Sequence, residues 1–343
     1  MQNKGLVWLV GVTAIAVVAA VWVARGTGLK VDPLAGQLVL PEAAKKIDDV
    51  GRIALVHGDQ KTTLMRDGDK WKIEERGGYL ADTTKVGQAL LALADMHYVE
   101  PKTADPKAYT RLEVEDAGGK DSKSTLVTLA DSKGTLLGDV ITGKHQADQL
   151  GGGEGGVYVR KAGSAQTWLA RSNLNLAGNT ADWLDKKFLD LPSAAFKQVV
   201  LTQPDNSKVT VTRDKPDDKF RLVEMPKDKK LKYDSVLDDA AGVLGALSLD
   251  DVRAAKDIEF PKDGVTHAQF TAFNGVVLNV DLADKDGLSW VKFAATGTGD
   301  GEKVAADLNA KLSPWVYALS SFKAKTLREK LDDLVEAPAP KAS

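Results

Sequence analysis

Short runs of β-branched and apolar residues occur in the same order twice along this chain. This internal repetition constrains the fold more than any other sequence feature. Each copy opens with three such runs separated by turn residues, which is typical of a meander of antiparallel strands. The runs of the first copy are 52–56, 62–67 and 71–74, and those of the second copy are 198–201, 209–214 and 220–223.

A helix is predicted after the meander in each copy. Asp82 is the expected N-cap of the first helix and Asp234 that of the second, because apolar residues follow each of them at helical spacing. The apolar face consists of Val86, Leu90, Leu93 and Met96 in the first helix, and of Leu237, Ala240, Leu244 and Leu247 in the second. The segments that follow these helices are rich in acidic and turn residues and read as loops.

Further strands are predicted in the later part of each copy. They are 125–129, 135–141, 157–160 and 167–170 in the first copy, and 268–273, 276–282 and 289–293 in the second. Each copy then ends in an amphipathic segment led by a tryptophan, Trp183 or Trp315, which we expect to form a closing helix. The spacing from Tyr158 to Trp183 equals that from Trp290 to Trp315, which supports this alignment.

These elements predict an α+β fold in which an N-terminal transmembrane helix precedes two tandem repeats of strands and helices. We expect an anchor at residues 1–25, a linker at 26–46, a first repeat at 47–192, a second repeat at 193–332 and a disordered tail at 333–343. A glycine-rich stretch at 151–156 reads as a flexible surface insertion. The alternative interpretation is that two unrelated β-rich domains share the same turn chemistry.

The N-terminal anchor is predicted from an uncharged stretch at residues 5–24. Apart from two glycines and a threonine, the stretch contains only Ala, Val, Leu, Ile and Trp. At about 1.5 Å per residue a helix of this length spans roughly 30 Å, the thickness of the hydrocarbon core of a bilayer. Lys4 and Arg25 flank it, and Trp8 and Trp22 lie near its ends, where indole rings favour the interface.

A membrane partner and a location follow from this stretch. The short head before it and the large body after it predict a single-pass protein of a bacterial inner (cytoplasmic) membrane with a periplasmic body. The lipid bilayer is then the partner of residues 5–24. Two alternatives to the anchor remain at this level: a cleaved secretory signal, and a helix buried in the core. If the anchor is retained, Ala16, Ala20 and Ala24 could form a helix-packing seam on it.

Composition argues against several classes of function. The chain has 343 residues, with 46 Lys and Arg against 48 Asp and Glu, so its net charge of −2 gives no basis for nucleic-acid binding. It contains no cysteine, which excludes disulfides, thiolate metal sites and thiol nucleophiles. The four histidines, His57, His97, His145 and His267, are too far apart in sequence to suggest a metal motif. We therefore predict no cofactor, no metal and no catalytic residue.

Two motifs resemble known sites but lack required residues, and the clusters of charged residues have ordinary surface interpretations. Residues 138–145 nearly match a phosphate-binding loop, but His145 replaces the final Ser or Thr and the β-branched residues inside predict a strand. Residues 281–287 lack the first and last ligands of a calcium loop and read as a hairpin turn. The acidic pairs at 217–218, 238–239, 250–251 and 332–333 read as solvated faces, and the basic cluster at 227–232 reads as a loop.

The order of the runs at 53–73, the segment 156–160 and the segment 182–191 resembles a bacterial family known as domain of unknown function 4340. The resemblance extends over about residues 45–330. It implies a single-pass envelope protein, often associated with gliding-motility-type ABC transport systems, with no catalytic residues to transfer. ABC transporter subunits are accordingly the protein partners that the resemblance suggests.

Three functions are compatible with the sequence. The first is a non-enzymatic interaction or scaffold module in the envelope, accessory to an ABC-type transport system. The second is a protein that binds or senses a ligand such as a glycan in a cleft between the repeats, with Trp168, Trp183, Trp290 and Trp315 as stacking faces. The third is a hydrolase whose two carboxylates come from distant segments and face each other across a cleft.

Overall fold

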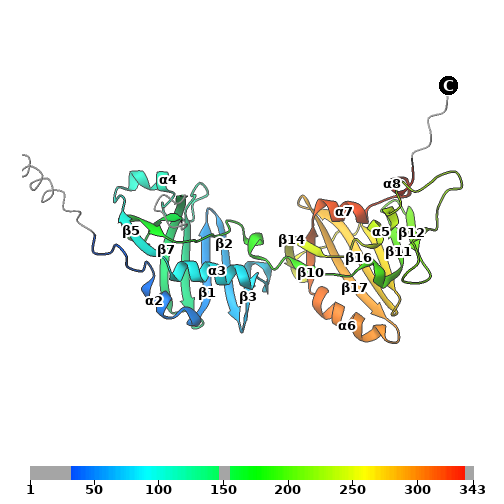
Figure 1. Cartoon of the computed structure of the whole chain (residues 1–343), viewed down its shortest axis with the longest axis horizontal. Coiled ribbons are helices and arrows are strands. Elements are labelled where there is room, and N and C mark those ends of the chain that lie inside the picture. Colours follow the sequence, from blue (N-terminus) through cyan, green and yellow to red (C-terminus); the bar gives the residue numbers. More distant parts are fainter. Residues whose placement is uncertain (1–31, 147–154, 337–343) are drawn as a thin grey trace, which may run out of the picture.

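The chain forms two lobes, which lie side by side in the computed structural model (Figure 1). The structure describes residues 32–146 and 155–336. Each lobe is built on one nine-stranded sheet, and neighbouring strands pair antiparallel throughout. The predicted anchor at residues 5–24 lies outside the described residues. Within these residues, none of the helices combines the length and the apolar character needed to cross a membrane.

The first lobe contains more strand than helix. Its strands are β1 (Val50–His57), β2 (Gln60–Asp67), β3 (Lys70–Ile73), β4 (Tyr79–Leu80), β5 (His97–Pro101), β6 (Thr125–Asp131), β7 (Leu136–Gln146), β8 (Gly156–Arg160) and β9 (Thr167–Arg171). Its helices are α2 (Pro41–Lys45), α3 (Thr83–Ala94) and α4 (Tyr109–Leu112), with short 3-10 turns η1 (Ile47–Asp49), η2 (Glu74–Arg76), η3 (Pro106–Ala108) and η4 (Thr180–Trp183).

The second lobe is also mainly strand. Its strands are β10 (Lys187–Leu189), β11 (Phe196–Thr202), β12 (Lys208–Thr212), β13 (Arg221–Leu222), β14 (Leu247–Ala254), β15 (Thr266–Ala272), β16 (Val276–Lys285), β17 (Leu288–Gly297) and β18 (Trp315–Leu319). Its helices are α5 (Val236–Ala241), α6 (Gly301–Leu312), α7 (Ser321–Leu327) and α8 (Leu331–Leu334), with 3-10 turns η5 (Ser193–Ala195) and η6 (Ala255–Asp257).

The predicted α+β class is therefore wrong, because two large antiparallel sheets dominate the described residues, none of whose helices could span a membrane. Two misreadings account for the error. The segments after α3 and α5, which we took for loops, are strands β5 and β14. Of the two predicted closing helices, one is the 3-10 turn η4, which ends at Trp183, and the other is strand β18, which begins at Trp315.

The two sheets share the same order of eight strands, from β3 to β5 in the first sheet and from β13 to β14 in the second; β4 lies outside this shared set in the first sheet, and β10 lies outside it in the second. The first runs β4-β3-β2-β1-β6-β7-β8-β9-β5, and the second, read from its other edge, runs β13-β12-β11-β15-β16-β17-β18-β14-β10. Strands β1, β5 and β9 thus take the places of β11, β14 and β18. Strand β18, which Trp315 opens, is therefore the counterpart of β9, and not of the turn η4 that ends at Trp183, as the spacing suggested.

The first crossover helix follows its prediction and the second does not. The backbone N–H of Lys85 donates to Asp82 Oδ1 at 3.1 Å, so Asp82 caps α3 as expected. Helix α5 instead begins after Ser235, without a side-chain cap at Asp234, and ends at Ala241. Leu244 and Leu247 are buried all the same, because Leu247 opens β14 and points into the core.

Parts of the predicted linker and tail belong to the folded lobes. Val39 N–H donates to Met96 O at 2.8 Å, and Val39 and Leu40 are buried, so this part of the predicted linker covers the outer edge of β5. At the other end, Leu334 and Val335 are buried, and Lys232 N–H donates to Leu334 O at 2.9 Å. The remainder of the predicted tail, 337–343, lies outside the described residues, as does most of the glycine-rich stretch; Gly156 opens β8.

One short segment joins the lobes and pairs with both sheets. Leu184 forms an antiparallel bridge with Ala81, just beyond β4 at the edge of the first sheet. Three residues further on, β10 pairs with β14 at the edge of the second sheet. The two edges therefore protect each other, and a continuous cluster of buried apolar side chains runs through both lobes.

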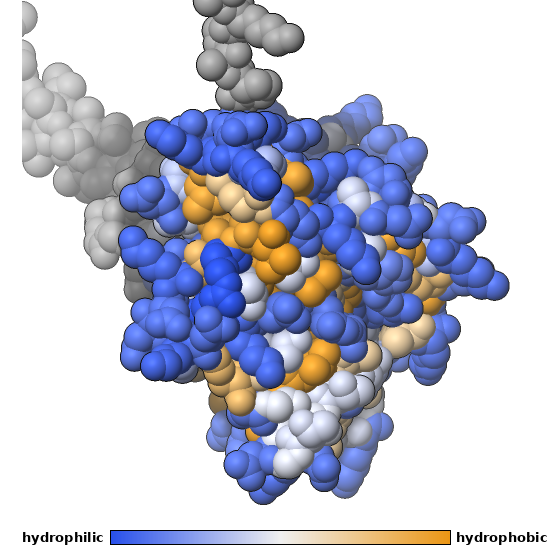
Figure 2. All heavy atoms as spheres, turned by 90° about the vertical axis from the view of Figure 1, so that its right-hand side faces the viewer, coloured by the Kyte–Doolittle hydropathy of each residue, from blue (hydrophilic) through white to orange (hydrophobic). Residues whose placement is uncertain are grey.

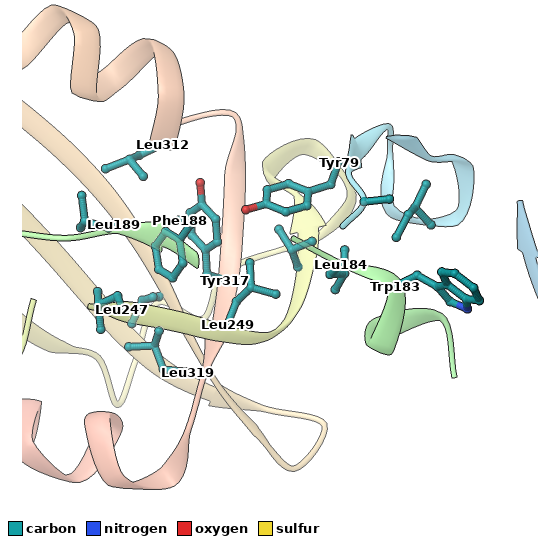
Figure 3. Close-up of a cluster of buried hydrophobic side chains, with 14 of the residues drawn as sticks. Tyr79, Trp183, Leu184, Phe188, Leu189, Leu247, Leu249, Leu312, Tyr317 and Leu319 are labelled. Carbon is teal, nitrogen blue, oxygen red and sulfur yellow. The ribbon is translucent and has the colours of Figure 1, made fainter. Parts of the chain in front are cut away.

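Aromatic rings fill the space beside this segment (Figure 3). The ring of Tyr79, from the first lobe, meets the ring of Trp315 edge-on, with centroids 5.0 Å apart, and that of Tyr317 at 6.3 Å. Tyr317 stacks in turn on Phe188, which belongs to β10, at 4.0 Å. Offset and edge-to-face pairs of this kind add to the free energy of burial.

A salt bridge also joins the two lobes at this junction. Arg76 Nε donates to Asp251 Oδ1 at 2.6 Å and Arg76 Nη2 donates to Asp251 Oδ2 at 3.2 Å, which is a bidentate pair between η2 and β14. The two side chains are only 14% and 12% exposed. The pair at 250–251 is thus only in part the solvated face that we predicted, because Asp251 is buried.

We predict that Arg76→Ala lowers the free energy of unfolding by about 2–4 kcal/mol, because the largely buried Asp251 carboxylate loses its bidentate partner and keeps only the longer contact of 3.6 Å with Arg253 Nη2 and the N–H of Val252. Urea denaturation measures this change. Arg52→Ala is the matched control: its ion pair with Glu74 is exposed, so its loss is expected to cost below about 1 kcal/mol. Equal losses in the two variants would show that the junction does not depend on the Arg76 pair.

Candidate functional site

The sequence motifs that resemble known sites are structural. The segment 138–145 lies within β7 and is a strand, as its β-branched residues predicted. A Cβ on Gly143 would lie 2.4 Å from the carbonyl oxygens of Leu112 and Glu113, so backbone fills the space that a phosphate would need. The segment 281–287 spans the hairpin between β16 and β17, with Asp286 and Gly287 in the left-handed conformation that a tight turn requires.

The histidines stay apart in the fold. His57 Nδ1 lies 3.0 Å from Thr125 Oγ1, and His267 Nδ1 lies 2.6 Å from Asp281 Oδ1 in the other lobe. His97 lies on β5 and His145 on β7. Across residues 32–146 and 155–336, the side chains of His, Asp and Glu form no group of three suited to a metal ion.

The tryptophans that we considered as stacking faces pack into the structure. Trp168, Trp183 and Trp290 are each at most 5% exposed. Trp315 is partly buried, and Tyr79 covers its ring. The cleft between the lobes, about 410 Å³, is lined by charged residues such as Arg76 and Arg253 and by apolar ones that include Trp290. Because Trp290 is only 3% exposed, the cleft offers little aromatic surface to a sugar ring.

The two largest grooves of the described chain occupy equivalent places in the two lobes. The first groove, about 610 Å³, lies between α3 and the segment that follows β9. The second groove, about 660 Å³, lies between α5 and the segment that follows β18. Since α3 matches α5 and β9 matches β18 in the shared topology, each groove is the same feature of the repeated fold.

The helix side of each groove uses equivalent positions of the two copies. Counted from the first residue of each predicted apolar face, Val86 or Leu237, the groove-lining residues Gln88, Leu91 and Ala92 correspond to Asp239, Gly242 and Val243. Asp239 lies on α5, and Gly242 and Val243 directly follow its end at Ala241.

In each lobe, a side chain on the opposite wall of the groove donates a hydrogen bond to the backbone carbonyl of the equivalent residue, Ala92 or Val243. Ser172 Oγ donates to Ala92 O at 2.8 Å in the first lobe. In the second lobe Lys323 Nζ donates to Val243 O and to Gly245 O, both at 2.9 Å. Each bond satisfies a carbonyl at the end of the crossover helix and fixes the width of the groove.

The side chains that line the two grooves differ in charge. The first groove is lined by the amides of Gln88, Asn173 and Asn175 and by one acid and two bases, Asp95, Lys85 and Arg171. The second collects carboxylates from three elements: Asp239 on α5, Glu329 after α7 and Asp333 on α8. The sequence pairs 238–239 and 332–333, which we read as solvated faces, thus contribute to one concave surface.

A bare apolar side chain lies beside each groove. Leu91 on α3 is 64% exposed, and Phe322 on α7 is 74% exposed. A phenylalanine in the first turn of an amphipathic helix normally turns inward, as Ala324 and Leu327 do in α7. Figure 2 views the second lobe from its outer end, where hydrophobic side chains form a band through a mostly hydrophilic surface.

Glu329 is the most perturbed carboxyl group in the second groove. Burial raises its pKa to about 7, and the negative charges of Asp333 and Asp239 add to this effect. Its Oε2 is buried and accepts no hydrogen bond within the described part of the chain. Gln203 fixes the backbone here by donating from Nε2 to Glu329 O at 3.1 Å. A half-buried carboxyl group with this pKa in a groove is typical of functional sites.

A family described as Domain of unknown function (DUF4340) matches residues 71–266. The chain belongs to this family. The match begins in β3 and ends at the start of β15, so it crosses the junction and takes in part of both lobes. Comparison with curated proteins and with solved structures gives no match.

We predict that Glu329→Gln stabilises the fold at pH 8 by about 1–2 kcal/mol and has almost no effect at pH 4. The folded-state pKa lies above the ordinary value of 4.5, so folding is penalised where the unfolded carboxyl is ionised. That penalty is absent below about pH 4.5 and complete above about pH 7. Urea denaturation at both pH values measures it, and Asp332→Asn, at an exposed carboxylate, is the control. A pH-independent effect of Glu329→Gln would contradict the assignment.

Proposed function

We propose that this protein is a non-enzymatic interaction module of the bacterial envelope, held at the inner membrane through residues 5–24, with its two lobes in the periplasm. The apolar composition of residues 5–24 supports the membrane attachment. The family resemblance supports a role as an accessory to an ABC-type transport system.

One observation carries the interaction role: each lobe has a groove at the same place, with a large apolar side chain left uncovered beside it. Exposed apolar side chains next to a concave surface mark binding sites, because burying them against a partner is favourable. Phe322 is the stronger of the two anchors, since aromatic residues dominate the energetics of interfaces.

Photo-crosslinking in bacterial cells that carry the gene tests this proposal. A photoreactive amino acid is placed at position 322, or at position 304 as the control, since Val304 is also exposed but lies on α6, away from the groove. We expect a discrete protein adduct from position 322, in the membrane fraction, and none from position 304. Deleting residues 5–24 is expected to move the chain to the soluble fraction. The absence of an adduct at 322, or the same adducts at both positions, would refute the interaction role.

A second candidate, an envelope hydrolase, is favoured by Glu329. A carboxyl group that keeps its proton near neutral pH beside ionised ones is what general acid catalysis of glycoside cleavage requires. Asp239 and Asp333 are the ionised neighbours.

Dye release from labelled peptidoglycan separates the two candidates. The hydrolase predicts soluble dye that Glu329→Gln abolishes, whereas the interaction module predicts no release between pH 5 and pH 8.

A further inference from the structure

We infer that the second groove binds a segment of a partner protein that presents a lysine or arginine next to an apolar side chain. This inference rests on the proposed interaction role and specifies the chemistry of the partner.

The apolar part of the inference comes from Phe322. Helix α7 buries Ala324, Thr326 and Leu327 and leaves Phe322 74% exposed at the groove. Tyr233, which also lines the groove, is 48% exposed. A peptide that covers these two rings removes aromatic surface from water, and a cationic side chain can also lie over a ring face.

The basic part comes from which charged groups already have partners. The groove is lined by four carboxyl groups and four cations, so its formal charges balance. Arg328 Nη2 donates to Asp284, which does not line the groove, at 2.7 Å, and Lys323 Nζ donates to two carbonyls. Among the described residues no ion pair joins Asp239 or Glu329 to a lysine or arginine, so these two carboxyl groups can accept a cationic side chain from a partner.

The position of the cation comes from Glu329. Its Oε2 is buried without a hydrogen bond, and an unsatisfied buried carboxylate oxygen is costly. An ammonium or guanidinium group that reaches this oxygen supplies a charge-assisted hydrogen bond and lowers that cost. In the first groove Gln88 occupies the position of Asp239, and the carboxylate that does line that groove, Asp95, is 84% exposed.

Fluorescence anisotropy with the purified protein tests the inference. The probe is a short labelled peptide of alternating arginine and leucine, and the matched control peptide carries glutamate in place of arginine. We expect saturable binding of the arginine peptide alone. Phe322→Ala is expected to weaken it by at least about tenfold, as truncation of a central aromatic anchor does. Leu91→Ala, in the first groove, is expected to leave it unchanged.

The charge dependence provides a second readout. Glu329→Gln is expected to weaken binding by about tenfold at pH 8 while keeping the protein folded. Wild-type binding is expected to strengthen from pH 6 to pH 8, as Glu329 ionises between Asp333 on α8, Asp239 on α5, Lys325 on α7 and Lys232. In Glu329→Gln this pH dependence is expected to disappear.

Several outcomes would overturn the inference. They are equal binding of the two peptides, equal effects of Phe322→Ala and Leu91→Ala, or arginine-peptide binding that appears only after residues 337–343, which include Lys341, are removed. The last result would identify the chain's own tail as the occupant. A protein adduct from position 322 together with failure of the peptide would retain the interaction role and reject only the basic partner.

Discussion

The fold depends on the pairing of one short segment with two sheets. Residues 184–189 complete the exposed edge of the first sheet and then that of the second, so neither lobe is left with an open edge on this side. Tyr79, Phe188 and Tyr317 then fill the space between the sheets, and the Arg76–Asp251 pair fixes their contact from one side. The lobes are therefore better described as one unit with a continuous core than as two independent domains joined by a linker.

The repeated topology explains why the grooves have the same construction and different chemistry. In each lobe the sheet and the crossover helix define the groove, and a side chain from the last strand's extension bonds to the end of that helix. These contacts restrict the choice of residue only at the buried positions and at the side chain that bonds to the helix-end carbonyl. The exposed positions are free to differ, and they do: the first groove displays amides, whereas the second displays carboxylates around an aromatic ring.

Strands in which apolar and polar residues alternate regularly could be predicted from the sequence. Strands in which charged residues interrupt that alternation could not. The predicted runs fall in β1–β3 and β6–β9 of the first lobe and in β11, β12 and β15–β17 of the second. Strand β14 was missed because two adjacent aspartates suggested a loop. A register shift between Leu249 and Asp251 places Asp251 at the junction, and no local pattern reports such a shift. Trp315 was misread because tryptophan suits the apolar face of a helix and a strand equally well.

The second groove could not be predicted from the sequence either, but for a different reason. Its acids come from α5, from the end of α7 and from α8, and each looks like an ordinary surface residue in its own segment. The raised pKa of Glu329 arises only from their convergence and from burial. The one local signal was Phe322, an aromatic residue that does not fit the buried face of its own helix.

The two described ends of the chain leave from opposite ends of the elongated pair of lobes (Figure 1). The second groove belongs to the lobe farther from residue 32, where the sequence enters the first lobe. With its N-terminus fastened to a surface, as we propose, this protein would hold the second groove away from that surface, with the first lobe as the spacer.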